Sequence, residues 1–492
     1  DRGERIVAPT IPSEVITPNN PPTGWGILGD IYSRGWQRTD NTNNFLSFFA
    51  TFAYSFKNRY VVNANVRNDA SNVFGQDINH RIDPTYSFGL SWRASEEAFF
   101  QKHLKWITTL NFRGTFGIQG NALTRESPEL ILSQQGVQPG YNRYFSTIGQ
   151  IPNPYLSWER TRNWNFGVDL ELFRMFYMNL EYYTRRSNAV ITVDLPFEYG
   201  IDDMKRNGGI IYNRGIEYTL SFTPIQKRDF SLNINLNASK NWNKGGETKI
   251  DRNTAMYLRG GSTQILKEGY PLSAFWSYSF AGLDGSNGKP MFNYVEVPDE
   301  EKSKSIDPTT YLVYSGETEP YFTGGLGFSF RYKSLSLNTS FSLLLGSKKR
   351  LPSPYSDFQG SGSMMPDPTK NVNRDLLNRW QKPGDEAYTN IPGLPTWPIE
   401  IGWTLPNTDS AESSIKMWEQ SDAMVFLRCR NIGLSWQMKK EWCDKIHAKN
   451  LAINFNMDNI FVIASKRFNG FDPELENSIM PRSFSLGLNI GF

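Results

Sequence analysis

Apolar and polar residues alternate strictly along many short segments of the chain. The last eleven residues, RSFSLGLNIGF, place five apolar side chains on one face and small polar residues on the other. The same period of two recurs in NWNFGVDLEL (163–172), FSLNINLNA (230–238) and LAINFNMDN (451–459). Because successive side chains of a strand point to opposite faces, the pattern predicts β-strands.

We predict thirteen strands of this kind. Most reach about ten residues. A tilted strand that crosses a bilayer needs roughly 9 to 11 residues, whereas a strand of a globular protein usually has about 5 or 6. A fourteenth candidate is AFWSYSFAGLD, at 274–284. The thirteen predicted strands are 45–56, 60–67, 85–94, 105–119, 161–173, 175–186, 210–224, 229–241, 321–333, 335–345, 424–439, 450–460 and 482–492.

The connections between these strands distinguish two all-β architectures. A soluble β-sandwich also has alternating strands, but its inner face must be apolar on both sheets. Here the second face carries Asn, Ser, Gly, Thr and charged residues, and short turns alternate with long loops such as 120–160 and 187–209. We therefore predict an all-β, transmembrane antiparallel β-barrel with short periplasmic turns and long extracellular loops.

The amino-acid composition indicates which kinds of partner the chain can bind. Lys and Arg number 52 against 49 Asp and Glu, a net charge of +3, which provides no basic surface for nucleic acid. Aromatic residues make up 14% of the chain, and those near strand ends, such as Trp92 and Tyr332, suit the interfacial girdles of a barrel in contact with membrane lipids. Two cysteines are too few for a disulfide framework.

The strand count predicts that these strands form only part of the wall of the barrel. If Phe492 ends on the periplasmic side, counting strands backward makes residues 1–44 an extracellular loop region and 45–492 the C-terminal part of the barrel. A closed single-chain barrel has an even number of strands so that no edge faces lipid. We therefore expect N-terminal strands that are absent from this chain.

Seven stretches carry a resemblance to a known family, in a consistent order and spacing. The chain resembles the C-terminal part of the barrel of a SusC-like (RagA-like) TonB-dependent outer-membrane transporter. The stretches are NRYVVNANVRNDASNVFG (58–75), YSFGLSWRASEEAFF (86–100), LNFRGTFGIQGNA (110–122), NPYLSWERTRNWNFGVDLELF (153–173), NRGIEYTLSF (213–222), FLRCRNIGLSW (426–436) and MDNIFVIASKRFNGFDPEL (457–475).

The resemblance implies a barrel of about 22 strands with a plugged lumen. It implies a location in a bacterial outer membrane of the Bacteroidota type, with a SusD-like surface lipoprotein as lid and active import of an oligomeric nutrient, glycan or peptide. TonB would act through the absent N-terminal region, together with the missing plug. The chain departs from the family at Ala70, where Gly is usual, and GLDGSNGKPMF (282–292) lacks a full acidic loop, so we expect neither metal nor cofactor.

Two other functions remain open. A siderophore or cobalamin receptor shares barrel and plug with the SusC-like type but usually lacks the lipoprotein lid. A passive or structural surface barrel would need neither plug nor TonB. We expect no enzyme, because the three histidines lie far apart in the sequence and no catalytic motif stands in a suitable context.

Candidate site residues fall into three groups. Loop tryptophans offer flat platforms for sugar rings, although they would pack loops together equally well; the candidates are Trp158, Trp276, Trp397 and Trp403. Charged residues on the polar strand faces we interpret as a wall network rather than as binding residues; they are Arg67, Asp69, Arg113, Asp169, Glu171, Glu181 and Glu217. Phe484 and Phe492 resemble the C-terminal signal that the barrel assembly machinery reads.

Overall fold

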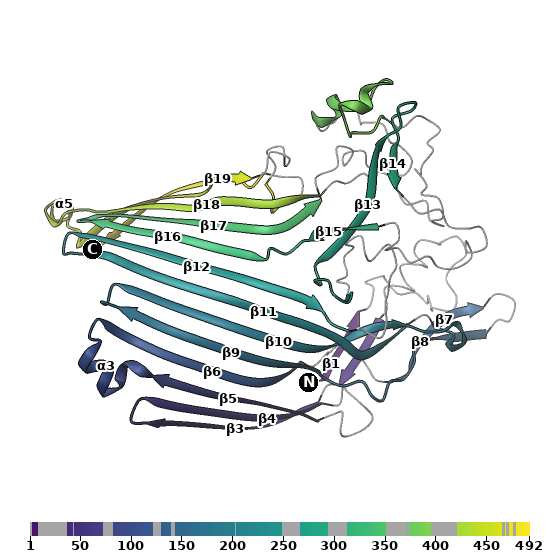
Figure 1. The fold of residues 1–492 in the computed structure, drawn as a ribbon, viewed down its shortest axis with the longest axis horizontal. Helices are drawn as coiled ribbons and strands as arrows, with labels where there is room; N and C mark the ends of the chain where they lie inside the picture. The colour runs from purple at the N-terminus through teal and green to yellow at the C-terminus, as the bar shows by residue number, and fades with distance from the viewer. Residues whose placement is uncertain are drawn as a thin grey trace, which may run out of the picture.

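The alternating segments form one large antiparallel sheet of thirteen strands, seen in the computed structural model of Figure 1. Strands follow one another in chain order across the sheet, from β3 at one edge to β20 at the other. The structure describes residues 2–7, 37–42, 44–71, 82–121, 129–138, 143–201, 203–247, 266–293, 312–350, 371, 374–394, 421–464, 468, 472–475 and 479–492.

All thirteen predicted strands are confirmed as members of this sheet. Several are longer than the alternation indicates, and β11 reaches 24 residues. The strands are β3 (Phe45–Phe56), β4 (Tyr60–Ser71), β5 (Ile82–Arg93), β6 (Ile107–Asn121), β9 (Glu159–Leu172), β10 (Phe176–Asp194), β11 (Asp203–Gln226), β12 (Phe230–Gly245), β16 (Phe322–Tyr332), β17 (Leu335–Arg350), β18 (Ser421–Gln437), β19 (Asn450–Ala464) and β20 (Ser483–Gly491).

Two details of the strand prediction are wrong. The segment expected as a loop at 187–209 is mostly strand, because β10 and β11 stay paired up to Asp194 and Asp203. A register shift between Ala189 and Val190 interrupts the alternation there, which hides the strand from a period-two search. The fourteenth candidate is a strand, β13 (Ala274–Leu283), but it pairs with β14 and β15 instead of the wall.

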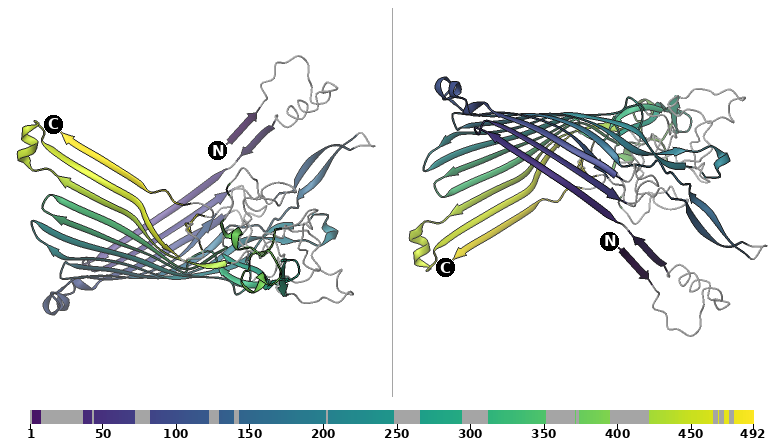
Figure 2. Two further views of the ribbon diagram at one scale, coloured as in Figure 1. Left: turned by 90° about the horizontal axis from the view of Figure 1, so that it is seen from above. Right: turned by 90° about the horizontal axis from the view of Figure 1, so that it is seen from below.

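The sheet is curved but not closed. Figure 2 shows it as a trough, with β3 and β20 along its two separate rims. Within the described residues, β3 pairs only with β4, and β20 pairs only with β19. Each edge strand therefore presents a row of unpaired backbone groups, which a lipid environment does not tolerate.

The two faces of the sheet differ sharply. One face, here called the apolar face, carries large exposed side chains; Phe48 is 66% and Leu486 is 77% exposed. The aromatic residues expected near strand ends lie on this face and are exposed, as Trp92 and Trp164 illustrate. The opposite face, here called the polar face, carries the Asn, Ser, Thr and charged positions of the same strands. An exposed apolar area of this extent is abnormal for a protein surface in water.

Short turns gather at one end of the sheet and long connections at the other (Figure 1). At the turn end lie η1 (Ala94–Glu96) and the six-residue helices α3 (Ala98–His103) and α5 (Lys440–Lys445). Three-residue connections close two hairpins, at 57–59 and 173–175, and in them Lys57, Asn58, Phe173 and Arg174 take the positive φ values of a type I′ turn. None of the helices in the described ranges has the length and hydrophobicity to cross a membrane.

The loop end carries small elements outside the wall. Two hairpins and a three-stranded sheet lie there, with the order β14-β13-β15 in the latter. These elements are β1 (Arg2–Val7), β2 (Gln37–Thr42), β7 (Ile131–Gln138), β8 (Arg143–Gln150), β14 (Pro290–Asn293), β15 (Leu312–Glu317), η2 (Phe197–Tyr199), η5 (Arg374–Asn378) and η6 (Asp385–Ala387).

Candidate functional site: the polar face and the loop end

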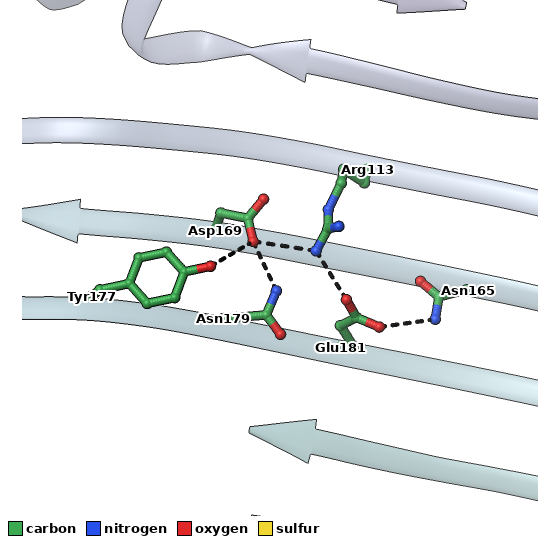
Figure 3. A network of polar contacts seen from close by, with 6 residues as sticks. All are labelled: Arg113, Asn165, Asp169, Tyr177, Asn179 and Glu181. Carbon is green, nitrogen blue, oxygen red and sulfur yellow. Dashed lines mark hydrogen bonds and ion pairs between the residues drawn. The ribbon is translucent and has the colours of Figure 1, made fainter. Parts of the chain in front are cut away.

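The polar face holds a charged network that spans three neighbouring strands (Figure 3). Arg113 of β6 donates hydrogen bonds to Asp169 of β9 at 3.2 Å and to Glu181 of β10 at 2.9 Å. Asn179 donates to Asp169 at 2.7 Å, and Asn165 donates to Glu181 at 3.2 Å. The carboxylates are thus bonded to neighbours within the wall, in agreement with the interpretation as a wall network.

A glycine makes room for this arginine. Gly167 of β9 lies between the arginine and one of its acids in the sheet, opposite Arg113 on β6 and opposite Glu181 on β10. A Cβ atom at position 167 would lie 3.1 Å from Nη2 of Arg113. The guanidinium therefore has room over the bare backbone of β9, from where it reaches Asp169 on that strand and Glu181 on β10.

The remaining predicted network residues behave differently from one another. Arg67 donates to Asp69 at 2.7 Å on β4, and Thr109 donates to Glu171 at 3.0 Å. Glu217 of β11 forms no hydrogen bond or ion pair with any described residue. It lines a groove instead.

This groove, of about 830 Å³, runs over β11, β12, β16 and β17. Gly325 and Gly327 form part of its floor, and a Cβ atom at Gly325 would collide with the Asn237 amide. Its charged residues are Glu217, Arg430 and Glu474. The lining is therefore rich in amides, hydroxyls and bare backbone, which suits hydrogen bonding to a polar, extended molecule.

A second ion cluster was not foreseen from the sequence. Arg428 of β18 binds Asp472 at 2.6 Å and Glu474 at 2.6 Å, and its side chain is only 2% exposed. The two acids lie in the connection between β19 and β20, so this connection is pinned onto the polar face. An irregularity between Cys429 and Asn431 marks the same stretch of β18. Residue parity counted from Leu434 and Trp436 would have assigned Arg428 to the apolar face, and the irregularity turns it to the polar face. No sequence pattern pairs it with Asp472, 44 residues away.

Two of the four candidate tryptophans lie in the described part of the chain, and both are buried. Trp158 is 8% exposed and Trp276 is 3% exposed. Rings of Tyr270 and Tyr314 pack against Trp276, with centroids 5.0 Å and 5.6 Å away. Trp397 and Trp403 lie outside the described residues. Because neighbouring residues of the chain cover Trp158 and Trp276, little of either ring is available to a ligand. Contact of the candidate tryptophans with substrate stays a prediction.

The loop 282–292 closes on itself. Asp284 accepts hydrogen bonds from the backbone and hydroxyl of Ser286, at 2.8 Å and 2.7 Å, and from Asn287 at 3.0 Å. The bond from the Ser286 hydroxyl is the main reason that the pKa of Asp284 lies below its ordinary value. Across the described ranges, no group of three or more His, Cys, Asp or Glu side chains could hold a metal ion.

Phe484 and Phe492 lie at the β20 rim of the sheet. Their side chains are 62% and 76% exposed, and Phe484 continues the apolar face. Phe492 follows the last residue of β20, and its carbonyl accepts a hydrogen bond from Lys449 at 2.9 Å. Their role as a barrel-assembly signal stays a prediction.

Comparison with protein families agrees with this architecture. The family model for "TonB dependent receptor-like, beta-barrel" matches residues 12–346. The match covers more than half of the chain, which therefore belongs to this family.

Similar proteins add detail. TonB-dependent receptor SusC of Bacteroides thetaiotaomicron is 26% identical, over 92% of this chain and 44% of its own length. TonB-dependent receptor P39 of Formosa agariphila is 24% identical, over 91% of this chain and 45% of its own. The RagAB peptide transporter structure has the same fold, with a TM-score of 0.71 and 22% identity over 93% of this chain and 48% of that one. The chain spans less than half the length of these relatives.

Proposed function

We propose that this chain forms about half of the wall of a TonB-dependent transporter in a bacterial outer membrane. One observation carries the proposal: a thirteen-stranded sheet has an exposed apolar face, an internally bonded polar face and two unpaired edges. The apolar face faces lipid, the polar face lines the lumen, and the edges continue into strands encoded outside this chain.

The proposed division of the chain follows from this orientation. Residues 45–492 form the C-terminal part of the barrel, and 1–44 form an extracellular region that includes the β1-β2 hairpin. Short turns face the periplasm and the loop end faces the outside. More than half of each similar protein lies beyond the matched region, which is where we place the remaining strands, the plug and the segment that TonB contacts.

The proposed activity is import of an oligomeric nutrient, a glycan or a peptide, with a SusD-like lipoprotein as lid. Similarity to SusC supports the pairing with such a lipoprotein. Similarity to a peptide transporter supports peptides as one class of transported molecule. The groove on the polar face, with amides, hydroxyls and charges of both signs, supports a polar cargo. We propose transport without enzymatic chemistry.

Deletion of the gene that encodes the full-length protein tests this proposal. Growth and uptake should fail on one class within a panel of oligosaccharides and oligopeptides, and loss of TonB in the parent strain should reproduce the defect. Mild detergent extraction should co-purify a stoichiometric lipoprotein. Uptake that persists without TonB would favour a passive pore, and a lone barrel that binds a metal chelate would favour a siderophore or cobalamin receptor.

A further inference from the structure

Positive charge is concentrated in the turns at one end of the sheet. Together the six turns that connect wall strands there carry thirteen Lys and Arg against five Asp and Glu. The complete chain has a net charge of only +3, so the residues outside these turns are net acidic. The turns, here called the basic rim, are 57–59, 93–106, 173–175, 226–229, 333–334 and 438–449.

Most cations of the basic rim have no anionic partner among the described residues. Every residue of the six turns is described by the structure, and of their cations only Arg59 forms an ion pair with a described residue, Glu97, at 3.0 Å. Arg93 donates to the side-chain oxygen of Asn58, and Lys449 donates to the main-chain oxygen of Phe492. The other cations of the turns are exposed and carry no ion pair to a described residue; they are Lys57, Lys102, Lys105, Arg174, Lys227, Arg228, Lys333, Lys439, Lys440 and Lys445.

A band of exposed aromatic side chains lies beside the basic rim on the apolar face. Two cations lie directly over rings of this band: Lys57 Nζ is 5.3 Å from the Phe56 centroid, and Lys333 Nζ is 5.4 Å from that of Tyr332. Aromatic side chains with one wet edge favour the headgroup level of a bilayer. The band consists of Phe56, Tyr60, Trp92, Trp106, Phe173, Tyr332, Trp436 and Trp442.

We infer that the basic rim binds the phosphate groups of anionic phospholipids in the membrane leaflet nearest the turns. The inference rests on the proposed function in one respect, that the apolar face lies in a bilayer. With the aromatic band at the headgroup level, the cations of the adjoining turns lie at the level of the lipid phosphates, where each contributes to attraction of an anionic surface.

The distribution of the charge favours a lipid surface over an acidic protein. The cations come from six successive turns along the whole end of the sheet (Figure 1). They follow the aromatic band and do not gather around the groove over β11, β12, β16 and β17, which lies away from the turns. A long, regular row of unpaired cations beside an aromatic band matches an extended anionic plane.

Spin-labelled lipids test this inference on the full-length protein in phosphatidylcholine vesicles. Electron paramagnetic resonance measures how strongly labelled phosphatidylglycerol and labelled phosphatidylcholine associate with the protein. The wild type should prefer phosphatidylglycerol about threefold, and about 0.5 M NaCl should reduce the preference. The triple variant Lys57→Gln, Lys333→Gln, Lys440→Gln should lose at least half of it.

The matched control removes three exposed cations near the loop end, with Arg206→Gln, Lys244→Gln and Lys382→Gln, and should keep the full preference. Equal association of the two lipids with the wild type would overturn the inference, as would equal losses in the two variants. TonB-dependent uptake by the same variants is a separate readout. If the preference for phosphatidylglycerol falls only in the basic-rim variant, the lipid site is supported even if uptake proves independent of TonB. If the wild type shows no lipid preference while uptake is normal, only the lipid site is refuted.

Discussion

Arg428 and Asp472 form an ion pair at 2.6 Å in which the two side chains are only 2% and 4% exposed. The arginine belongs to wall strand β18 and the aspartate to the following long connection, so the pair joins a loop to the polar face. Removal of one partner from a buried pair leaves the other charged group without compensation, which costs far more than loss of a surface pair.

We therefore expect Arg428→Met in the full-length protein to lower the free energy of unfolding by about 3 kcal/mol. The midpoint of unfolding in detergent, followed by the heat-dependent shift of the folded barrel on a gel, measures the change. Arg430→Met is the matched control, because Arg430 lies nearby, is exposed and forms no ion pair with described residues. Equal midpoints for the two variants would contradict the role of the buried pair.

The Arg113 network predicts coupling between strands that are not neighbours. Arg113→Ala and Glu181→Ala should each destabilise the protein slightly, and the double variant should lose less than the sum of both. The coupling free energy should be about 0.5 to 1 kcal/mol, because the guanidinium is 40% exposed and solvent screens the pair. Strictly additive losses would show that the contact contributes nothing.

A close approach of Tyr183 to the backbone makes Gly215 sensitive to any side chain. A Cβ atom there would lie 2.6 Å from the Tyr183 ring and 2.9 Å from the Lys240 carbonyl. Gly215→Ala should therefore cost about 1 to 3 kcal/mol by overpacking. Gly208→Ala, on the same strand with no atom within 4 Å of its Cβ, should be nearly neutral in the same unfolding assay. Similar losses in both variants would contradict the close approach.

Glu97 gives the turn end a pH dependence. The Tyr60 hydroxyl, the Trp92 indole and Arg59 all donate to its carboxylate, and the bond from Tyr60 is the main reason that the pKa of Glu97 lies below its ordinary value. A carboxyl with a lowered pKa stabilises the fold above its unfolded pKa, and the contribution disappears as pH falls through the folded value.

We expect Glu97→Gln to lower the unfolding temperature at pH 7, and the difference from wild type to be smaller at about pH 3, because acid protonates the carboxylate. Glu96→Gln is the control, because the exposed Glu96 forms no hydrogen bond or ion pair with described residues, and its unfolding temperature should match wild type throughout. A Glu97→Gln defect of equal size at both pH values would contradict the ionic account.

The wall was predictable because each strand repeats a simple physical requirement. Lipid on one side and water on the other force a period of two, and the segments 230–237 and 483–492 show it without interruption. The alternation no longer predicts the structure where a segment leaves the boundary between lipid and water. β13 alternates as well, but it joins a small sheet at the loop end, and a register irregularity disguises the outer part of β10.

The polar contacts were predictable only where sheet register brings residues together. Arg113, Asp169 and Glu181 share a face, and their pairing follows from neighbouring strands. Arg428 meets Asp472 through the path of a long connection, which local pattern does not encode. The burial of Trp276 has the same origin, since its partners arrive with the tertiary arrangement of the loop end.

The orientation of the two faces is the central claim, and cysteine scanning along β5 tests it most directly. Single spin labels in the full-length protein in lipid vesicles should alternate in their exposure. Positions Phe88 and Leu90 should be accessible to oxygen dissolved in lipid, whereas Ser87, Gly89 and Ser91 should be accessible to a water-soluble nickel complex. Equal access of the nickel complex to both sets would show that the sheet faces water on both sides and would contradict the account.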